Sequence, residues 1–220
     1  MGAWQPRLDV LPAEQRRLWP LLAAVPATFT LYGGTGLALR LGHRPSVDFD
    51  FFTDTEFDPV ALAGSNPLFA SGFVEVTGTN SLGMLVSGVR LSLFGGIGIA
   101  VLEPPDLAEN GVAVASLLDL AGTKAKALLD RVETKDYLDL DAILRAGTSL
   151  SDVLGAFALL FPQVSPMIVA RSLGYLDQPE LVELPGTVRR RLLDAINQTR
   201  TVTSFGPRYA SITMARRATR

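Results

Sequence analysis

A short run of alternating residues, Val47-Asp48-Phe49-Asp50-Phe51, constrains the fold of this chain more than any other feature. Successive side chains of a β-strand point to opposite faces, so Asp48 and Asp50 share one face, about 6.6 Å apart along the strand. Val47, Phe49 and Phe51 then point into the core. Asp-x-Asp also occurs on solvated strands, but carboxylates among bulky apolar residues are costly to bury unless something pairs with them. The run favours a Mg²⁺ site, because Mg²⁺ takes oxygen ligands and leaves positions open for substrate phosphates.

The run Gly33-Gly34-Thr35 lies between a strand expected over 27–32 and a short helix expected over 35–41. A strand that enters a helix through glycines exposes backbone N–H groups and the positive end of the helix dipole, which together bind anions. The functional interpretation is a triphosphate-binding turn, and the alternative is a tight corner that needs glycine. The spacing matches neither a dinucleotide-binding fingerprint nor a P-loop.

Composition excludes several classes of protein. The 220 residues are 48% hydrophobic and 19% charged, which allows one large domain or two small ones with a full core. The absence of Cys excludes disulfides and thiolate chemistry and favours a cytoplasmic location, and a single His excludes a structural zinc site. No apolar run is long enough to cross a bilayer and no secretory signal is evident, so we expect no membrane partner.

The net charge of −2 is unevenly distributed. Residues 185–220 contain eight Arg and one acidic residue, a net charge of +7, so the preceding residues carry −9. A basic C-terminal segment on an acidic body can bind nucleic acid. The alternative is a solvated helix face followed by a frayed tail.

The order of expected elements indicates an α+β or α/β fold. A helix over 11–25, bent or shortened by Pro20, precedes the first strand, and the aspartate strand covers 47–52. Further short strands are expected in series over 73–77, 83–86, 89–94 and 98–101. Helices are expected over 116–131, 134–144, 149–161, 166–175 and 186–198. We therefore expect an α/β core over 1–112, a helical half over 113–199 and a basic tail over 200–220 that can be flexible.

A third group of charged residues lies in the helical half, at Lys124, Lys126, Arg131, Lys135, Asp136 and Asp139. In one unbroken helix Lys124, Arg131 and Lys135 would fall within about 40° of one another, with Asp139 near the same stripe. An ordinary exposed helix face with charge pairs has the same pattern, so the group alone does not indicate a function.

Two segments in this order resemble a known family. Residues 31–52 are similar to the signature of AbiEii/AbiGii-type nucleotidyltransferase toxins, in which Gly-Gly or Gly-Ser precedes Asp-x-Asp; here thirteen residues separate Gly34 from Asp48. Residues 124–139 resemble the family's Lys…Arg-x-x-x-Lys-Asp-x-x-Asp segment. The resemblance covers about 28–145 and implies a DNA polymerase β-like nucleotidyltransferase core with a mixed sheet, followed by a helical half.

The resemblance implies transfer of a nucleoside monophosphate from an NTP to an acceptor hydroxyl, with pyrophosphate leaving. Asp48 and Asp50 would hold one or two Mg²⁺. The run Gly33-Gly34-Thr35 would position the triphosphate, and Ser46 would contact its phosphates. Lys124 would stabilise charge on the nucleotide, with Asp139 or Asp136 orienting Lys124 or acting as a base. Arg131 and Lys135 would be further nucleotide contacts.

One position departs from the wider superfamily, many members of which carry a third carboxylate on a neighbouring strand. The equivalent position here is Ser92, which is not acidic, and Glu75 is the candidate substitute. The lack of an acid at Ser92 counts against two-metal chemistry more than it counts against the resemblance to the family.

The resemblance also implies partners, because characterised relatives modify the 3′ acceptor end of tRNA. They pair with an antitoxin of the transcriptional-repressor type, which we expect to be encoded nearby in a prokaryotic genome. Two alternatives stay open: the same fold acting on a small-molecule or protein acceptor, and a degenerate protein that only binds nucleotide or a partner.

Overall fold

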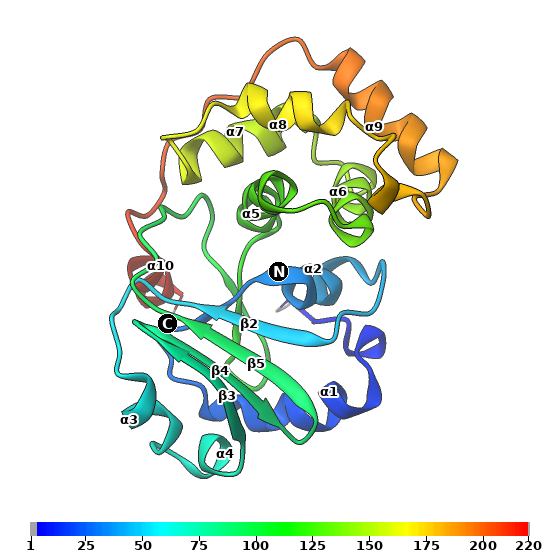
Figure 1. Ribbon diagram of the computed structural model, residues 1–220. Coiled ribbons are helices and arrows are strands. Elements are labelled where there is room, and N and C mark those ends of the chain that lie inside the picture. The colour runs from blue at the N-terminus through cyan, green and yellow to red at the C-terminus, as the bar shows by residue number, and fades with distance from the viewer. Residues whose placement is uncertain (1–3, 220) are drawn as a thin grey trace. The chain divides into compact units, whose positions relative to one another are not determined.

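A seven-stranded mixed sheet organises the N-terminal half of the chain (Figure 1). The structure is a computed structural model that describes residues 4–219. Along the sheet the strands follow the order β3-β4-β5-β2-β1-β7-β6. Their bounds are β1 Thr30–Leu31, β2 Asp48–Phe52, β3 Phe73–Gly78, β4 Ser81–Val86, β5 Val89–Phe94, β6 Asp106–Leu107 and β7 Ala113–Val114.

Strand β2 connects two parts of this sheet. It pairs antiparallel with β1 and parallel with β5, while β3, β4 and β5 form an antiparallel meander. On the far side, β1 pairs parallel with β7, which pairs antiparallel with β6. The expected meander is confirmed over β3 to β5. The strand expected over 98–101 is not formed, because Val101 makes only a single bridge to Tyr209.

One face of β2 anchors the sheet to the hydrophobic core. Phe49 and Phe51 are fully buried, and the ring of Trp19 packs on Phe49 with centroids 6.1 Å apart. Burying a side chain of this size contributes about 1.5–3 kcal/mol. Alternation then places Asp48 and Asp50 on the opposite face, as expected. The expectation for Val47 is wrong: it precedes the strand and is 64% exposed.

Proline and glycine divide the first helical segments. The helix expected over 11–25 is split into α1 (Ala13–Leu18) and a 3₁₀ segment, η2 (Trp19–Ala24), because Pro20 has no N–H to continue the α-helical pattern. Helix α2 (Gly33–Leu41) directly follows β1 and ends at Gly42, which has φ 62°. Short elements complete this half: η1 Leu8–Val10, α3 Pro59–Ala63 and α4 Pro67–Ala70.

The C-terminal half is helical, as expected. Its elements are α5 Leu117–Asp130, α6 Thr134–Arg145, α7 Leu150–Leu160, α8 Pro166–Leu173, η3 Pro179–Leu181 and α9 Gly186–Gln198. Gly122 of α5 lies so close to α7 that a Cβ there would sit 3.0 Å from the carbonyl carbon of Ala156, which accounts for a glycine inside a helix. Over residues 4–219 no single helix is long and apolar enough to cross a membrane; only the bent pair α6 and α7, taken together, meets that test of length and composition.

The contacts divide the chain into two compact units. The first runs to Ser116 and resumes at Arg208, and the second is Leu117–Pro207. Where we expected one basic tail over 200–220, the described part of that segment is divided between the units. Thr203 donates its N–H to the Ser151 carbonyl at 3.2 Å in the second unit.

Helix α10 (Ile212–Ala218) belongs to the first unit. The backbone N–H of Thr213 donates to Asp54 at 2.9 Å, and Ile212 and Ala215 are buried. Charge density alone suggested a solvated tail. The apolar face formed by Ile212 and Ala215 explains why the segment folds instead.

Candidate metal and phosphate site

The paired aspartates lie on the polar face of β2 and are both half-buried. Across the parallel pairing with β5, Asp48 is opposite Arg90 and Asp50 is opposite Ser92. Within residues 4–219 no group of three or more His, Cys, Asp or Glu side chains could hold a metal ion. Two carboxylates still fit Mg²⁺, which commonly binds one or two protein carboxylates and completes its shell with water and substrate phosphates.

The glycine turn, Gly33-Gly34-Thr35 at the start of α2, lies directly beside the aspartates. Gly33 has φ +67°, and a Cβ on it would collide with Oδ2 of Asp50. The N–H of Tyr32 donates to the Asp50 carbonyl at 2.8 Å, and the hydroxyl of fully buried Thr35 donates to the Asp48 carbonyl at 2.5 Å. Thr35 therefore connects the turn to the aspartate strand through its side chain.

A hydroxyl and a guanidinium face the second glycine of the turn. A Cβ on Gly34 would lie 2.8 Å from Ser46 Oγ and 3.2 Å from Arg44 Nη2. The start of α2, Ser46 and Arg44 thus supply backbone, hydroxyl and cationic donors at one place, the combination that binds phosphate. The sequence predicted Ser46 but assigned no role to Arg44, although its position two residues before Ser46 was a usable signal.

We expect Gly33→Ala to reduce nucleotide binding at least about tenfold, because the methyl group would meet the Asp50 carboxylate in addition to straining the backbone. Gly88→Ala is the matched control: Gly88 has φ +80°, but a Cβ there meets nothing within 4 Å. NTP titration in the presence of Mg²⁺ measures the difference. Equal affinities for the two variants would show that contact with Asp50 does not matter.

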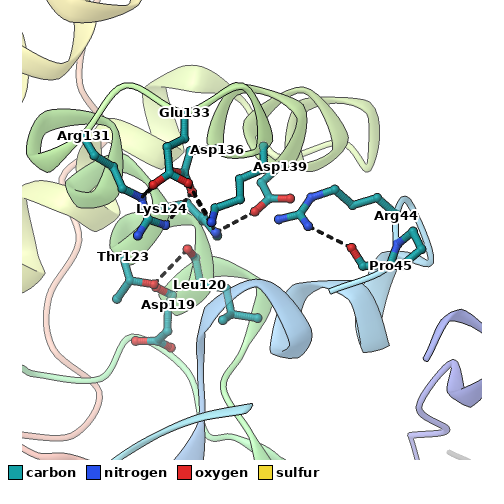
Figure 2. A network of polar contacts seen from close by, with 11 residues as sticks. Arg44, Pro45, Asp119, Leu120, Thr123, Lys124, Arg131, Glu133, Asp136 and Asp139 are labelled. Atoms are coloured by element: carbon teal, nitrogen blue, oxygen red, sulfur yellow. Dashed lines mark hydrogen bonds and ion pairs between the residues drawn. The ribbon is translucent and has the colours of Figure 1, made fainter. Parts of the chain in front are cut away.

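In the second unit Lys124 is held between two buried carboxylates (Figure 2). Lys124 is only 6% exposed, and Asp136 and Asp139 of α6 are fully buried. Its Nζ lies 3.0 Å from Asp136 Oδ1 and 2.6 Å from Asp139 Oδ2. Arg131 donates through Nε to the other Asp136 oxygen at 2.8 Å. Four of the predicted site residues therefore form one network, in which Lys124, Asp136 and Asp139 are buried and Arg131 is exposed.

The charges around Asp136 determine its protonation. Burial alone would raise the pKa of Asp136, but hydrogen bonds from Arg131 and the charge and hydrogen bond of Lys124 outweigh burial and lower that pKa below its usual value. Asp136 is therefore ionised at neutral pH and accepts hydrogen bonds from both cations. A carboxylate with a lowered pKa is a weak base, so this geometry favours a role in orienting Lys124.

Comparison with known proteins identifies the family. The sequence profile described as "Nucleotidyl transferase AbiEii toxin, Type IV TA system" matches residues 21–79 and 97–208. The chain belongs to the AbiEii family. It is also 31% identical over 153 residues to the "Uncharacterized protein aq_aa25" of Aquifex aeolicus (strain VF5), an alignment that covers 68% of this chain and 74% of that protein. The AbiEii description indicates nucleotidyltransferase activity, which implies an NTP substrate, and a toxin of a type IV system implies an antitoxin.

The AbiEii-type segment 124–139 is not one helix. Helix α5 ends at Asp130 and α6 begins at Thr134, so the single stripe of Lys124, Arg131 and Lys135 considered from the sequence does not form. Lys135 pairs with Glu133 at 2.6 Å, and both side chains are largely exposed. Lys135 therefore lies at the surface beside Glu133, whereas Lys124 is buried.

The third carboxylate common in the wider superfamily is absent from the position expected for it in this AbiEii member. Ser92, the position expected to be equivalent, lies on β5 opposite Asp50. Glu75, on β3, does not form a group of three carboxylates with the aspartates within residues 4–219. Its carboxylate instead accepts from Arg90 Nε at 2.9 Å.

Proposed function

We propose that the protein is a Mg²⁺-dependent nucleotidyltransferase with a polymerase β-like core, and that it transfers a nucleoside monophosphate from an NTP to the 3′ end of a tRNA. The observation that carries this proposal is the contact between the Asp50 carboxylate and the start of the glycine turn at Gly33. A cation held by Asp48 and Asp50 and an anion held by the turn would be immediate neighbours. A metal-bound triphosphate has this arrangement of charges.

In the first unit, one group of residues would bind the phosphates of the nucleotide and another would bind the metal. The N–H of Gly34, the Ser46 hydroxyl and the Arg44 guanidinium would hold the triphosphate and take up the charge that grows on the leaving pyrophosphate. Asp48 and Asp50 would hold Mg²⁺, which when bound polarises the phosphate under attack and activates the acceptor hydroxyl. Because a Cβ on Gly33 would collide with the Asp50 carboxylate, the metal and the phosphates would be bound directly beside each other.

The residues of the second unit have a supporting role in this proposal. Lys124 would stabilise negative charge on the nucleotide, and the ion pairs with Asp136 and Asp139 would keep its ammonium group oriented. Arg131 and Lys135 are the further nucleotide contacts.

The family description implies an antitoxin, and we propose that it is of the transcriptional-repressor type and is encoded beside this gene. A second candidate function is nucleotide or partner binding without transfer, and the specific observation that favours it is Ser92 in place of a third carboxylate opposite Asp50.

One experiment separates these functions. The protein is incubated with total tRNA, Mg²⁺ and each α-³²P-labelled NTP in turn, and label on RNA and release of pyrophosphate are both measured. Label on tRNA is the expected result. Pyrophosphate release without labelled RNA would overturn the tRNA acceptor and indicate a small-molecule or protein acceptor. NTP binding with neither signal would overturn transfer and favour the binding function.

A further inference from the structure

A row of small side chains hollows the sheet beside the aspartate pair. Reading across four strands from β2 to β3, the paired positions are Asp50, Ser92, Gly83 and Val76. The strands β2, β5, β4 and β3 lie next to one another in Figure 1. Gly83 has no side chain and that of Ser92 is small. The sheet face that carries Asp50 is therefore recessed at the middle of this row. A pocket of about 360 Å³ occupies the recess.

The neighbouring rows form the walls of this pocket. On one side Arg90 lies opposite Asp48, and its guanidinium is held by Glu75 through Nε at 2.9 Å and Nη2 at 3.4 Å. On the other side Phe94, 37% exposed, follows Ser92 by two residues on the same face. Val76, 64% exposed, closes the far end. The pocket therefore combines an aromatic surface with a positioned cation.

The chemistry of transfer determines which substrate can use this side. In an in-line displacement the attacking hydroxyl approaches opposite to the leaving pyrophosphate. The phosphate-binding turn follows β1, and Gly33 contacts Asp50 from the β1 side of β2. The acceptor must then come from the other side of β2, where β5 and the recess lie.

We propose that this pocket seats the terminal nucleotide of a single-stranded RNA end, with the base on Phe94 and Val76 and the adjoining phosphate on Arg90. The inference rests on the proposed function and deepens it by assigning the acceptor a place. Base stacking on an aromatic ring and a cation for the backbone are the two features of single-strand recognition. At about 360 Å³, this pocket is large enough to hold a ligand of small-molecule size. Strands β4 and β5 also lie within residues 80–96, which the AbiEii profile leaves unmatched.

Filling the recess with a larger side chain tests the proposed acceptor pocket directly. A Cβ on Gly83 would make only ordinary contacts, 3.6 Å or more from Val76, so Gly83→Ala adds volume without a clash, and Gly83→Val adds two further methyl groups at the same place. Gly83→Val is expected to raise the KM for tRNA about tenfold or more, with Gly83→Ala between it and the wild type. Affinity for NTP should stay within about twofold, because the phosphate-binding turn is untouched.

Arg90 provides a second, electrostatic test. Arg90→Gln is expected to raise the KM for tRNA about tenfold and to lower the salt dependence of tRNA binding by about one phosphate contact, whereas Arg90→Lys should restore part of the affinity. Arg17→Gln is the matched control, because Arg17 is also an exposed arginine paired with a glutamate, Glu14, at 3.0 Å. Thermal unfolding confirms that each variant is folded.

The outcomes separate the two proposals. If the wild type labels tRNA and the Gly83 and Arg90 variants do so with unchanged KM, the acceptor pocket is overturned and the proposed function stands. If the wild type labels no RNA, the proposed function fails and this inference fails with it. A KM that rises for tRNA alone, while NTP affinity and the Arg17 control stay unchanged, supports the pocket.

Discussion

Asp50→Asn is expected to abolish nucleotide transfer, reducing its rate at least about a hundredfold, while leaving the protein folded. Asparagine has the shape of aspartate but lacks the negative charge that Mg²⁺ requires, and Asp50 is only half-buried on a strand anchored by Phe49 and Phe51. Asp48→Asn is expected to have the same effect. Pyrophosphate release with each NTP and Mg²⁺ measures the loss.

A second measurement connects this loss to the metal. With NTP present, Mg²⁺ should raise the unfolding temperature of the wild type, because a ligand that binds only the folded state stabilises it. That increase should disappear in Asp50→Asn. Asp9→Asn, at an exposed position in η1, is the control and should retain both activity and the increase. Activity of Asp50→Asn within twofold of the wild type would contradict the assignment of Asp50 to the metal.

Lys124→Met is expected to lower the free energy of unfolding by about 3–5 kcal/mol, as well as to abolish transfer. Removal of the ammonium leaves the carboxylates of Asp136 and Asp139 buried without their shared cation. Lys126→Met is the control on the same helix: Lys126 pairs with Asp130 at the surface, and such a pair contributes less than about 1 kcal/mol. Urea unfolding monitored by helical circular dichroism measures the change in the free energy of unfolding for Lys124→Met and for Lys126→Met.

The acid dependence of stability offers an independent check of this network. Because the pKa of Asp136 is lower in the folded than in the unfolded state, its ion pairs stabilise the protein above the unfolded pKa, and that stability is lost as the pH falls towards the folded pKa. Stability of the wild type should therefore decrease on acidification below about pH 4, the ordinary range of an aspartate. In Asp136→Asn this part of the decrease should be absent. An identical acid profile would show that Asp136 is not held ionised by Lys124 and Arg131.

Local patterns predicted much of the fold. The alternation around Phe49 placed Asp48 and Asp50 on one face, Pro20 divided the first helical segment, and Gly42 ended α2. These features depend on residues within a few positions of one another, where side-chain period and backbone preference decide the conformation. The family was identified for the same reason, because its two motifs are short segments read directly from the chain.

The network around Lys124 shows where local pattern was insufficient. Lys124, Lys126 and Lys135 are the same residue type in one charged segment, yet only Lys124 is buried. The difference arises because the chain turns between α5 and α6 and so brings Asp136 and Asp139 onto Lys124. Helix period alone could not reveal that turn's direction. Helix α10 is a similar case, because its place in the first unit depends on Asp54, far away in the sequence.

The sequence by itself determined the family, the aspartate strand and the glycine turn, since each is specified by neighbouring residues. Tertiary structure alone decided that Arg44 faces Gly34, that Glu75 pairs with Arg90 and not with the aspartates, and that Ser92 and Gly83 align beside Asp50. The physical reason is that contacts between distant segments depend on strand order and register, and a shift of one residue would turn each side chain to the opposite face.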